Sequence, residues 1–239
     1  MTHPIIASLT NVSQHFSNRK VLDALSLEFK EREITALLGH SGSGKSTILK
    51  LLNGMLKPDS GNVSVFGKHF DYVNANQIRL QIGYVVQSVG LFPHLTISQN
   101  IGLLGELTNK EKPEIKTRVS DLMEMVQLPN SYLTKYPYQL SGGEQQRVGL
   151  CRAFFLKPPL VLMDEPFASL DYKTRAKIYG HLLQMQASEG SSVIVVTHQL
   201  EEAIHLCNRF YWVQNGSVHH SGNKDTLKSI SHEFKEIYL

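Results

Sequence analysis

The stretch that decides the fold is Gly39-His40-Ser41-Gly42-Ser43-Gly44-Lys45-Ser46-Thr47. It matches the phosphate-loop pattern G-x-x-x-x-G-K-[ST], in which consecutive backbone N–H groups surround a polyphosphate. Gly42 and Gly44 allow positive φ angles and a close approach of the backbone. Lys45 is expected to reach the β- and γ-phosphates, and the Ser46 hydroxyl to bind Mg²⁺. The stretch therefore predicts a nucleoside-triphosphate site.

The residues on either side of this loop fit the same prediction. The apolar run Ile34–Leu38 before it predicts a buried strand. One face of a predicted helix after it carries Ile48, Leu51, Leu52 and Met55. The N-terminus of such a helix favours anions, because its free N–H groups and its dipole both point at the ligand.

Composition and charge limit the possible classes of protein. The chain has 239 residues, 41% hydrophobic and 19% charged, which is typical of a soluble globular protein. Its net charge of +3 is spread without a dense basic run, so we expect no nucleic-acid partner. No apolar stretch reaches the roughly 18 residues that span a bilayer, and the N-terminus lacks a signal-peptide pattern, so a membrane role would need a partner. Cys151 and Cys207 follow no metal-site spacing and are expected to be packing residues of a reduced, cytosolic protein.

The rest of the chain predicts one α/β domain over 1–239. Residues 5–28 alternate as in an antiparallel sheet, interrupted by a polar turn at 14–20. Short apolar runs at 82–87, 160–163 and 192–196 predict further core strands, each ending on a polar residue. About 88–156 has a helical pattern and predicts an inserted helical subdomain, whereas the tail predicts a strand, a turn region at Gly216 and Gly222, and a helix.

Two acids follow the apolar run 160–163. Asp164 and Glu165 would lie at the carboxyl end of a strand, where open α/β sheets bind ligands. We expect Asp164 to hold Mg²⁺ through its water shell and Glu165 to polarise the attacking water. The sequence Asp-Glu-Pro also suits an ordinary strand-to-turn ending, but the upstream phosphate loop favours catalysis.

A second helix start is predicted at Leu140-Ser141-Gly142-Gly143-Glu144-Gln145-Gln146-Arg147. Ser141 fits an N-cap and Glu144 the far end of a capping box. The open amides of this first turn could bind an anion, although physical reasoning alone favours an ordinary capped helix.

This segment resembles the signature motif of the ATP-binding cassette (ABC) family, and other family motifs follow in order. Gln87 is similar to the Q-loop glutamine, which senses Mg²⁺ and contacts the membrane partner. The stretch Ala168-Ser169-Leu170-Asp171 resembles the D-loop, and His198 resembles the switch histidine that senses the γ-phosphate. Phe16 occupies the place of the aromatic residue that stacks on adenine, although an aromatic near a strand end is often part of the core.

The resemblance implies a P-loop NTPase (RecA-like) core with an antiparallel β subdomain and an inserted α-helical subdomain. The implied activity is ATP hydrolysis with ATP and Mg²⁺ as cofactors, and the implied catalytic residues are Glu165, His198 and Gln87. The implied metal ligands are Ser46, Gln87 and Asp164, and Ser141, Gly142 and Gly143 would bind nucleotide with the phosphate loop. In the family, the signature helix of one subunit closes on the phosphate loop of another, as a homodimer or with a paired ATPase.

The expected partners are integral-membrane permease subunits and a solute-binding protein, at the cytoplasmic face of the bacterial inner membrane. The segment Val89–Thr96 could dock such a permease or form a local core. Several stretches, among them 82–87, 90–94, 136–141 and 158–166, most resemble ATPases that import osmoprotectants such as glycine betaine or choline, and other polar amino-acid importers share much of this. Those ATPases often carry a C-terminal regulatory module, which is expected to be absent here or supplied elsewhere.

Three other classes remain to be weighed. An ABC exporter ATPase for lipid, lipoprotein or drug is the first alternative. A soluble cassette ATPase of translation or DNA repair would need a second cassette or a long coiled coil. A P-loop kinase or GTPase has no use for the signature segment.

Three features depart from the family pattern or stand outside it. Glu31-Arg32-Glu33 replaces the usual Gly-Glu, so that turn cannot rely on glycine, and His40 stands where proline is common. Both could alter nucleotide affinity or the response to pH without removing a catalytic group. His219 and His220 have no further ligand nearby in the sequence and are expected in a solvated turn rather than at a metal site.

Overall fold

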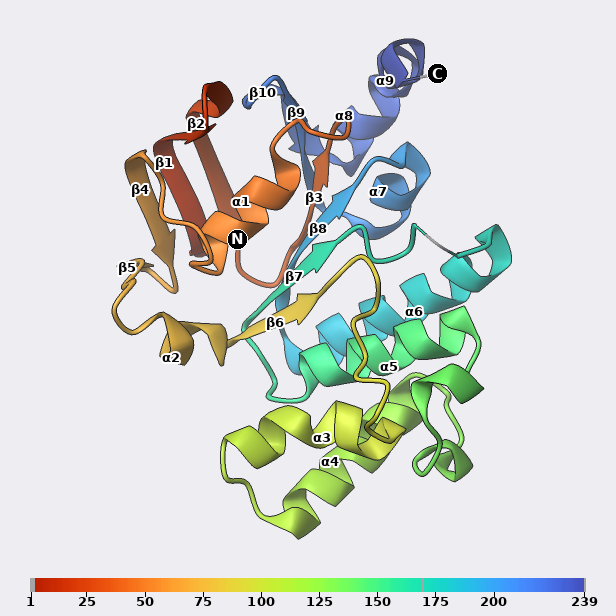
Figure 1. The fold of residues 1–239 in the computed structure, drawn as a ribbon. Helices are drawn as coiled ribbons and strands as arrows, with labels where there is room; N and C mark the ends of the chain where they lie inside the picture. Colours follow the sequence, from red (N-terminus) through yellow and green to blue (C-terminus); the bar gives the residue numbers. More distant parts are fainter. Residues whose placement is uncertain (1–2, 169, 239) are drawn as a thin grey trace. The chain divides into compact units, whose positions relative to one another are not determined.

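The computed structural model describes residues 3–168 and 170–238, with side chains through Phe234. These residues form two compact units (Figure 1). Unit 1 consists of the residues up to 79, residues 162–165, and those from 192 onwards. Unit 2 consists of residues 80–161 and 166–191, so it extends beyond the helical insertion predicted for about 88–156.

Unit 1 begins with a four-stranded antiparallel sheet in the order β2-β1-β4-β5. These strands span Ile5–Phe16 (β1), Arg19–Lys30 (β2), Ser60–Val65 (β4) and Lys68–His69 (β5). The predicted alternation is confirmed, because β2 buries Leu22, Leu25 and Leu27 while their neighbours face outwards. The polar turn predicted at 14–20 is wrong in extent, since pairing continues to Phe16 and Arg19 and leaves only two residues to turn.

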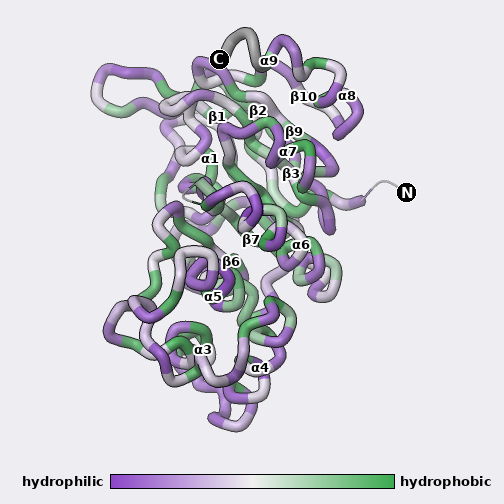
Figure 2. The backbone as a smooth tube through the Cα atoms, turned by 90° about the vertical axis from the view of Figure 1, so that its right-hand side faces the viewer, coloured by the Kyte–Doolittle hydropathy of each residue, from purple (hydrophilic) through white to green (hydrophobic). Residues whose placement is uncertain are grey.

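The larger sheet supplies the core of unit 1. Its strands there lie in the order β10-β9-β3-β8-β7: Ser217–Asn223 (β10), Arg209–Gln214 (β9), Ile34–Leu38 (β3), Ser192–Thr197 (β8) and the carboxyl end of Leu160–Asp164 (β7). The central strand β3 is parallel to both β8 and β9. Both β3 and β8 are buried along their whole length, which explains their mostly apolar sequences. The tube of Figure 2 shows the hydropathy of each residue along the chain.

Five helices complete unit 1: Lys45–Leu52 (α1), Ala75–Arg79 (α2), Leu200–Leu206 (α7), Lys224–Ser229 (α8) and Ser231–Tyr238 (α9). Ile48, Leu51 and Leu52 are buried on α1 as predicted, but Met55 lies beyond the helix and is 60% exposed. The expected turn at Gly222 is also wrong, because this residue lies within β10.

Unit 2 is mostly helical. Its elements are Ile82–Val85 (β6), Ile97–Leu107 (α3), Lys112–Met125 (α4), Gly142–Phe154 (α5) and Tyr172–Glu189 (α6), with two short 3₁₀ turns before α5. Asp171 caps α6 by accepting a hydrogen bond from the Thr174 amide, and Gly190 ends it in the left-handed conformation. Cys151 of α5 and Cys207 of unit 1 are buried, and burial raises the pKa of their thiols to about 12 and about 11.

Candidate nucleotide site

The phosphate loop joins β3 to α1 in unit 1. Gly42 has φ 78° and Gly44 φ 103°, so both glycines take the positive φ angles predicted for them. A Cβ on Gly44 would also lie 2.6 Å from Leu22 Cδ2, so this glycine is required by packing as well. Gly44 is the N-cap of α1 and has no side chain to cap it, so the first-turn amides remain directed at the loop.

Lys45 is held inside this loop. Its side-chain amino group donates hydrogen bonds to the backbone oxygens of Gly39 at 2.8 Å and His40 at 2.6 Å. The residue is only 4% exposed. Burial lowers the pKa of Lys45, and the carboxylates of Glu165 and Asp164 oppose that shift. The site therefore contains a cation that is costly to leave unpaired and that favours a strongly anionic ligand.

Ser46 and Asp164 come from distant parts of the sequence and meet at the carboxyl edge of the sheet. The Ser46 hydroxyl donates to Asp164 Oδ1 at 2.9 Å. Burial raises the pKa of Asp164 and adjacent Glu165 adds to the rise, whereas the Ser46 hydrogen bond and the Lys45 charge lower it. A hydroxyl and a carboxylate at this separation form a hard oxygen pair of the type Mg²⁺ prefers, so these residues fit the predicted metal.

Glu165 and His198 form a second pair, at the ends of β7 and β8. Glu165 Oε2 lies 3.3 Å from His198 Nδ1. The backbone of Glu165 is left-handed, with φ 45°, and its amide donates to the Val196 carbonyl at 3.0 Å. Non-glycine residues rarely adopt this conformation, and it costs about 1–3 kcal/mol where it is imposed.

The turn that carries His198 is fixed by residues that the sequence analysis did not single out. The buried Thr197 hydroxyl donates to Glu202 Oε2 at 3.0 Å and accepts a hydrogen bond from the Gln199 amide. Glu202 could have indicated this turn in the sequence, because a carboxylate in the first turn of a helix such as α7 stabilises the helix start.

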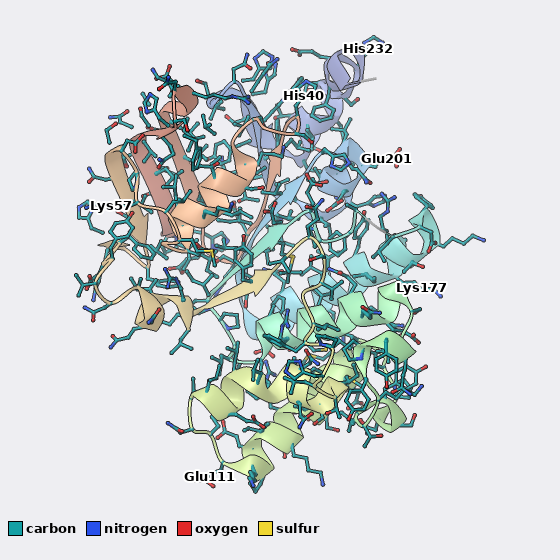
Figure 3. All side chains as sticks on the ribbon, in the orientation of Figure 1. His40, Lys57, Glu111, Lys177, Glu201 and His232 are labelled. Carbon is teal, nitrogen blue, oxygen red and sulfur yellow. The ribbon has the colours of Figure 1, made fainter. Side chains whose placement is uncertain are left out.

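Phe16 and Arg19 lie where the β1–β2 hairpin reaches the phosphate loop. Phe16 is 45% exposed, which excludes the alternative that it is a core residue. Its cross-strand partner is Arg19, and an Arg19 guanidinium nitrogen lies 3.8 Å from the position that a Cβ on Gly42 would occupy. Arg19 was missed because an arginine in a polar turn is usually solvated. His40, labelled in Figure 3, is exposed.

The signature residues belong to unit 2. The predicted capping box is confirmed at the start of α5: Ser141 Oγ accepts a hydrogen bond from the Glu144 amide, while Glu144 Oε2 accepts from Ser141 N and Oγ, both at 2.8 Å. Tyr132 donates to the other oxygen of Glu144 at 3.1 Å. A Cβ on Gly143 would lie 2.5 Å from Thr174 Cγ2, so this glycine lets α6 approach α5.

A surface cavity of about 790 Å³ opens beside this helix start, within unit 2. Its lining includes Ser141, Gly142 and Gly143 together with Leu170 and Asp171 of the predicted D-loop. Arg147 and Lys177 also line it and could contact an anion, while the acids Glu144 and Asp171 in the same lining offset their charge. Ser169 of the D-loop lies outside the described residues.

Gln87 also belongs to unit 2. It lies two residues beyond β6, which ends at Val85 and is therefore shorter than the predicted strand 82–87. The structure thus brings together Lys45, Ser46, Asp164, Glu165 and His198 within unit 1. Gln87 and the signature residues form their own local structures in unit 2.

A phosphate loop after the central parallel strand β3, with acids at the end of β7, one strand further along the same sheet, defines a P-loop NTPase fold. A family profile described as "ABC transporter" matches residues 22–168. The chain belongs to the ABC transporter family.

Named relatives and a solved structure resemble it over most of its length. It is 36% identical to the glycine betaine/carnitine/choline transport ATP-binding protein OpuCA of Bacillus subtilis, over 92% of this chain and 58% of that protein. It is 37% identical to the glycine betaine uptake system ATP-binding protein YehX of Escherichia coli, over 91% of this chain and 71% of that protein. The dimeric post-hydrolysis structure of the ATP-binding cassette MJ0796 with ADP and Pi matches with a TM-score of 0.80 and 32% identity, over 91% of this chain and 98% of that one.

The chain spans 58–61% of the length of two of its curated relatives. Among the described residues, the longest apolar helices fall short of what a membrane crossing requires.

Proposed function

We propose that this chain binds and hydrolyses ATP and thereby powers solute import through a separate membrane permease. The observation that carries the proposal is the convergence of Lys45, the Ser46–Asp164 pair and the Glu165–His198 pair on one edge of the sheet in unit 1. Phosphoryl transfer needs such groups, because charge neutralisation and positioning of water supply most of the catalysis.

Each group has a defined task in this mechanism. The α1 amides and Lys45 bind the β- and γ-phosphates, and Phe16 offers an exposed ring to the adenine. Ser46, Asp164 and Gln87 would hold Mg²⁺, which neutralises charge that develops on the phosphates. Glu165 accepts a proton from the attacking water, and His198 orients the Glu165 carboxylate and faces the γ-phosphate.

The start of α5 is the second anion site of the proposal. Its first-turn amides, with Arg147 and Lys177 in the cavity beside it, suit the γ-phosphate of a nucleotide bound to another copy or to a paired ATPase. Two copies related by a twofold axis would then form two equivalent sites, and the dimeric state of the MJ0796 cassette supports this arrangement.

The proposed cargo is an osmoprotectant such as glycine betaine or choline, because the OpuCA and YehX relatives are named for these solutes. The same names favour import over the exporter alternative. A permease, a solute-binding protein and a place at the cytoplasmic face of the inner membrane complete the proposal.

The catalytic assignment is tested with Glu165→Gln. This variant should bind ATP, lose turnover by about a hundredfold or more, and elute as an ATP-dependent dimer in size exclusion. The control is Glu201→Gln, an exposed acid labelled in Figure 3, which should hydrolyse ATP normally. Normal turnover by Glu165→Gln would refute the role of this carboxylate.

The shared site is tested by mixing two inactive variants. Lys45→Ala removes the lysine of the phosphate loop, and Ser141→Arg blocks the anion site at the start of the signature helix α5. A random mixture of the two should recover about a quarter of the wild-type rate, because half of the dimers are mixed and each mixed dimer retains one intact site. If the mixture is no more active than either variant alone, the proposal that one chain completes the nucleotide site of the other is wrong.

The cargo is tested in cells that lack the endogenous gene. Uptake of labelled glycine betaine and choline should return with the wild-type chain and not with Glu165→Gln. Restored uptake of a polar amino acid alone would contradict the osmoprotectant assignment while leaving the ATPase assignment intact.

A further inference from the structure

We propose that His219, His220 and Glu233 bind a divalent transition-metal ion of the zinc type. The two histidines lie on β10 and the glutamate lies on α9, all within unit 1 (Figure 1). One potential ligand atom from each of the three side chains lies within 4.8 Å of the others. The solvated turn predicted here from the sequence is wrong, because His219 and His220 lie within β10, and Glu233 is too far along the chain for a spacing pattern to reveal it.

A β-bulge explains how two consecutive residues face the same ligand. Val218 pairs with Val213 and His220 with Trp212, so His219 is an extra residue without its own cross-strand partner. In a regular strand neighbouring side chains point to opposite faces, whereas a bulge redirects one of them. Both imidazoles therefore approach Glu233.

The spacing of the ligand atoms suits one ion. Glu233 Oε1 lies 3.0 Å from His220 Nε2 and 3.4 Å from His219 Nε2. Two ligands held at about 2.05 Å from a tetrahedral zinc ion are about 3.3 Å apart. The observed separations therefore match two edges of such a tetrahedron. Two imidazoles and one carboxylate suit Zn²⁺, Ni²⁺ or Cu²⁺ better than Mg²⁺, and they leave a position for water.

The site is built on an apolar wall. The fully buried Trp212 ring lies 4.9 Å from the His219 ring and 5.3 Å from the His220 ring, measured between centroids. The Phe234 ring lies 4.8 Å from Trp212, next to Glu233 in the sequence. This packing restricts the orientation of the imidazoles, which favours ligands held in place for a metal ion.

The experiment uses the fact that Trp212 is the only tryptophan of the chain. Co²⁺ is titrated into the full chain without nucleotide, and Trp212 fluorescence is recorded, because a paramagnetic ion close to the ring quenches it. We expect saturable quenching at about one equivalent, reversal by diamagnetic Zn²⁺, and the intense visible absorption of tetrahedral cobalt.

The variants identify the ligands. His219→Ala, His220→Gln and Glu233→Gln should each weaken Co²⁺ binding by more than about tenfold, since even loss of a ligand's outer partner costs that much. The matched controls are His69→Ala on β5 and His232→Ala, which neighbours Glu233 and is labelled in Figure 3; both should bind like the wild type. Unsaturable quenching, or an equal loss in the controls, would overturn the proposal. Circular dichroism of each variant ensures that a loss of binding is not a loss of fold.

Discussion

Arg118 of α4 connects three parts of unit 2, and its removal should be strongly destabilising. Its guanidinium donates to the backbone oxygens of Phe154 at 2.8 Å and Phe155 at 3.1 Å, at the end of the signature helix α5. It also donates to Glu189 Oε1 at 2.7 Å, near the end of α6. The two charged side chains are 12% and 6% exposed.

The size of the effect follows from this burial. Arg118→Met keeps most of the apolar stem but removes the cation, and leaves the Glu189 carboxylate buried without its partner. Removing one member of a buried ion pair costs about 3–5 kcal/mol. The α5 carbonyls also lose their donors and the favourable charge at the helix C-terminus. Since the free energy of unfolding of whole domains is about 5–15 kcal/mol, this single change should remove a large part of it.

Urea denaturation followed by circular dichroism measures the cost. The control is the double variant Arg118→Met/Glu189→Gln, which no longer buries an unpaired charge. It should be more stable than Arg118→Met alone, and the two single changes should not add. Two results would refute the reasoning: a loss below about 1 kcal/mol in Arg118→Met, or strict additivity in the cycle.

Three further changes test unit 1. Asp164→Asn keeps an acceptor for Ser46 but removes a buried charge, so it should abolish hydrolysis while raising the melting temperature. The pKa of Asp164 is raised in the folded chain, so the stability that its protonated carboxyl contributes at low pH is lost as the pH rises. The gain in melting temperature of Asp164→Asn over the wild type should therefore grow from acid to neutral pH. An equal gain at all pH values would contradict this reasoning. Gly39→Ala places a Cβ 2.3 Å from the Val213 carbonyl oxygen. The variant should lose about 1–3 kcal/mol of folding stability and bind a fluorescent ATP analogue more weakly. An unchanged melting temperature would contradict the importance of this contact. Arg32 has φ 59°, so Arg32→Gly should relieve about 1–2 kcal/mol of backbone strain and lose about 0.5–1 kcal/mol to backbone entropy. The melting temperature should therefore rise slightly, and a fall in melting temperature would show that the arginine side chain stabilises the turn.

The residues of the candidate nucleotide site could be proposed from the sequence because they lie in local patterns. The loop 39–47 carries its own glycines, and Asp164 and Glu165 directly follow an apolar strand. Parallel strands bring their carboxyl ends to one edge, so the meeting of Ser46 with Asp164 follows from the topology. The turn at Arg32 is instructive, because the chain adopts there the left-handed conformation that glycine normally provides.

The boundaries of the helices and strands and the long-range contacts could not be predicted from the sequence. Met55 has the helical spacing, yet α1 ends at Leu52 with Asn53 as its C-cap. The approach of Arg118 to Glu189 depends on how three helices pack, and no local pattern encodes that. The bulge at His219 shifts the register by one residue without glycine or proline to announce it.

The hydrogen bond from the Glu165 amide to the Val196 carbonyl joins the ends of β7 and β8 next to the Glu165–His198 pair. Two residues beyond Val196 stands His198, so a sideways slip between these strands would carry the imidazole away from the carboxylate. Hydrogen–deuterium exchange at the Glu165 amide would therefore measure how firmly the Glu165–His198 pair is aligned. Exchange as slow as that in the interior of β8 would indicate that the Glu165 carboxylate and the His198 imidazole stay aligned in the folded chain.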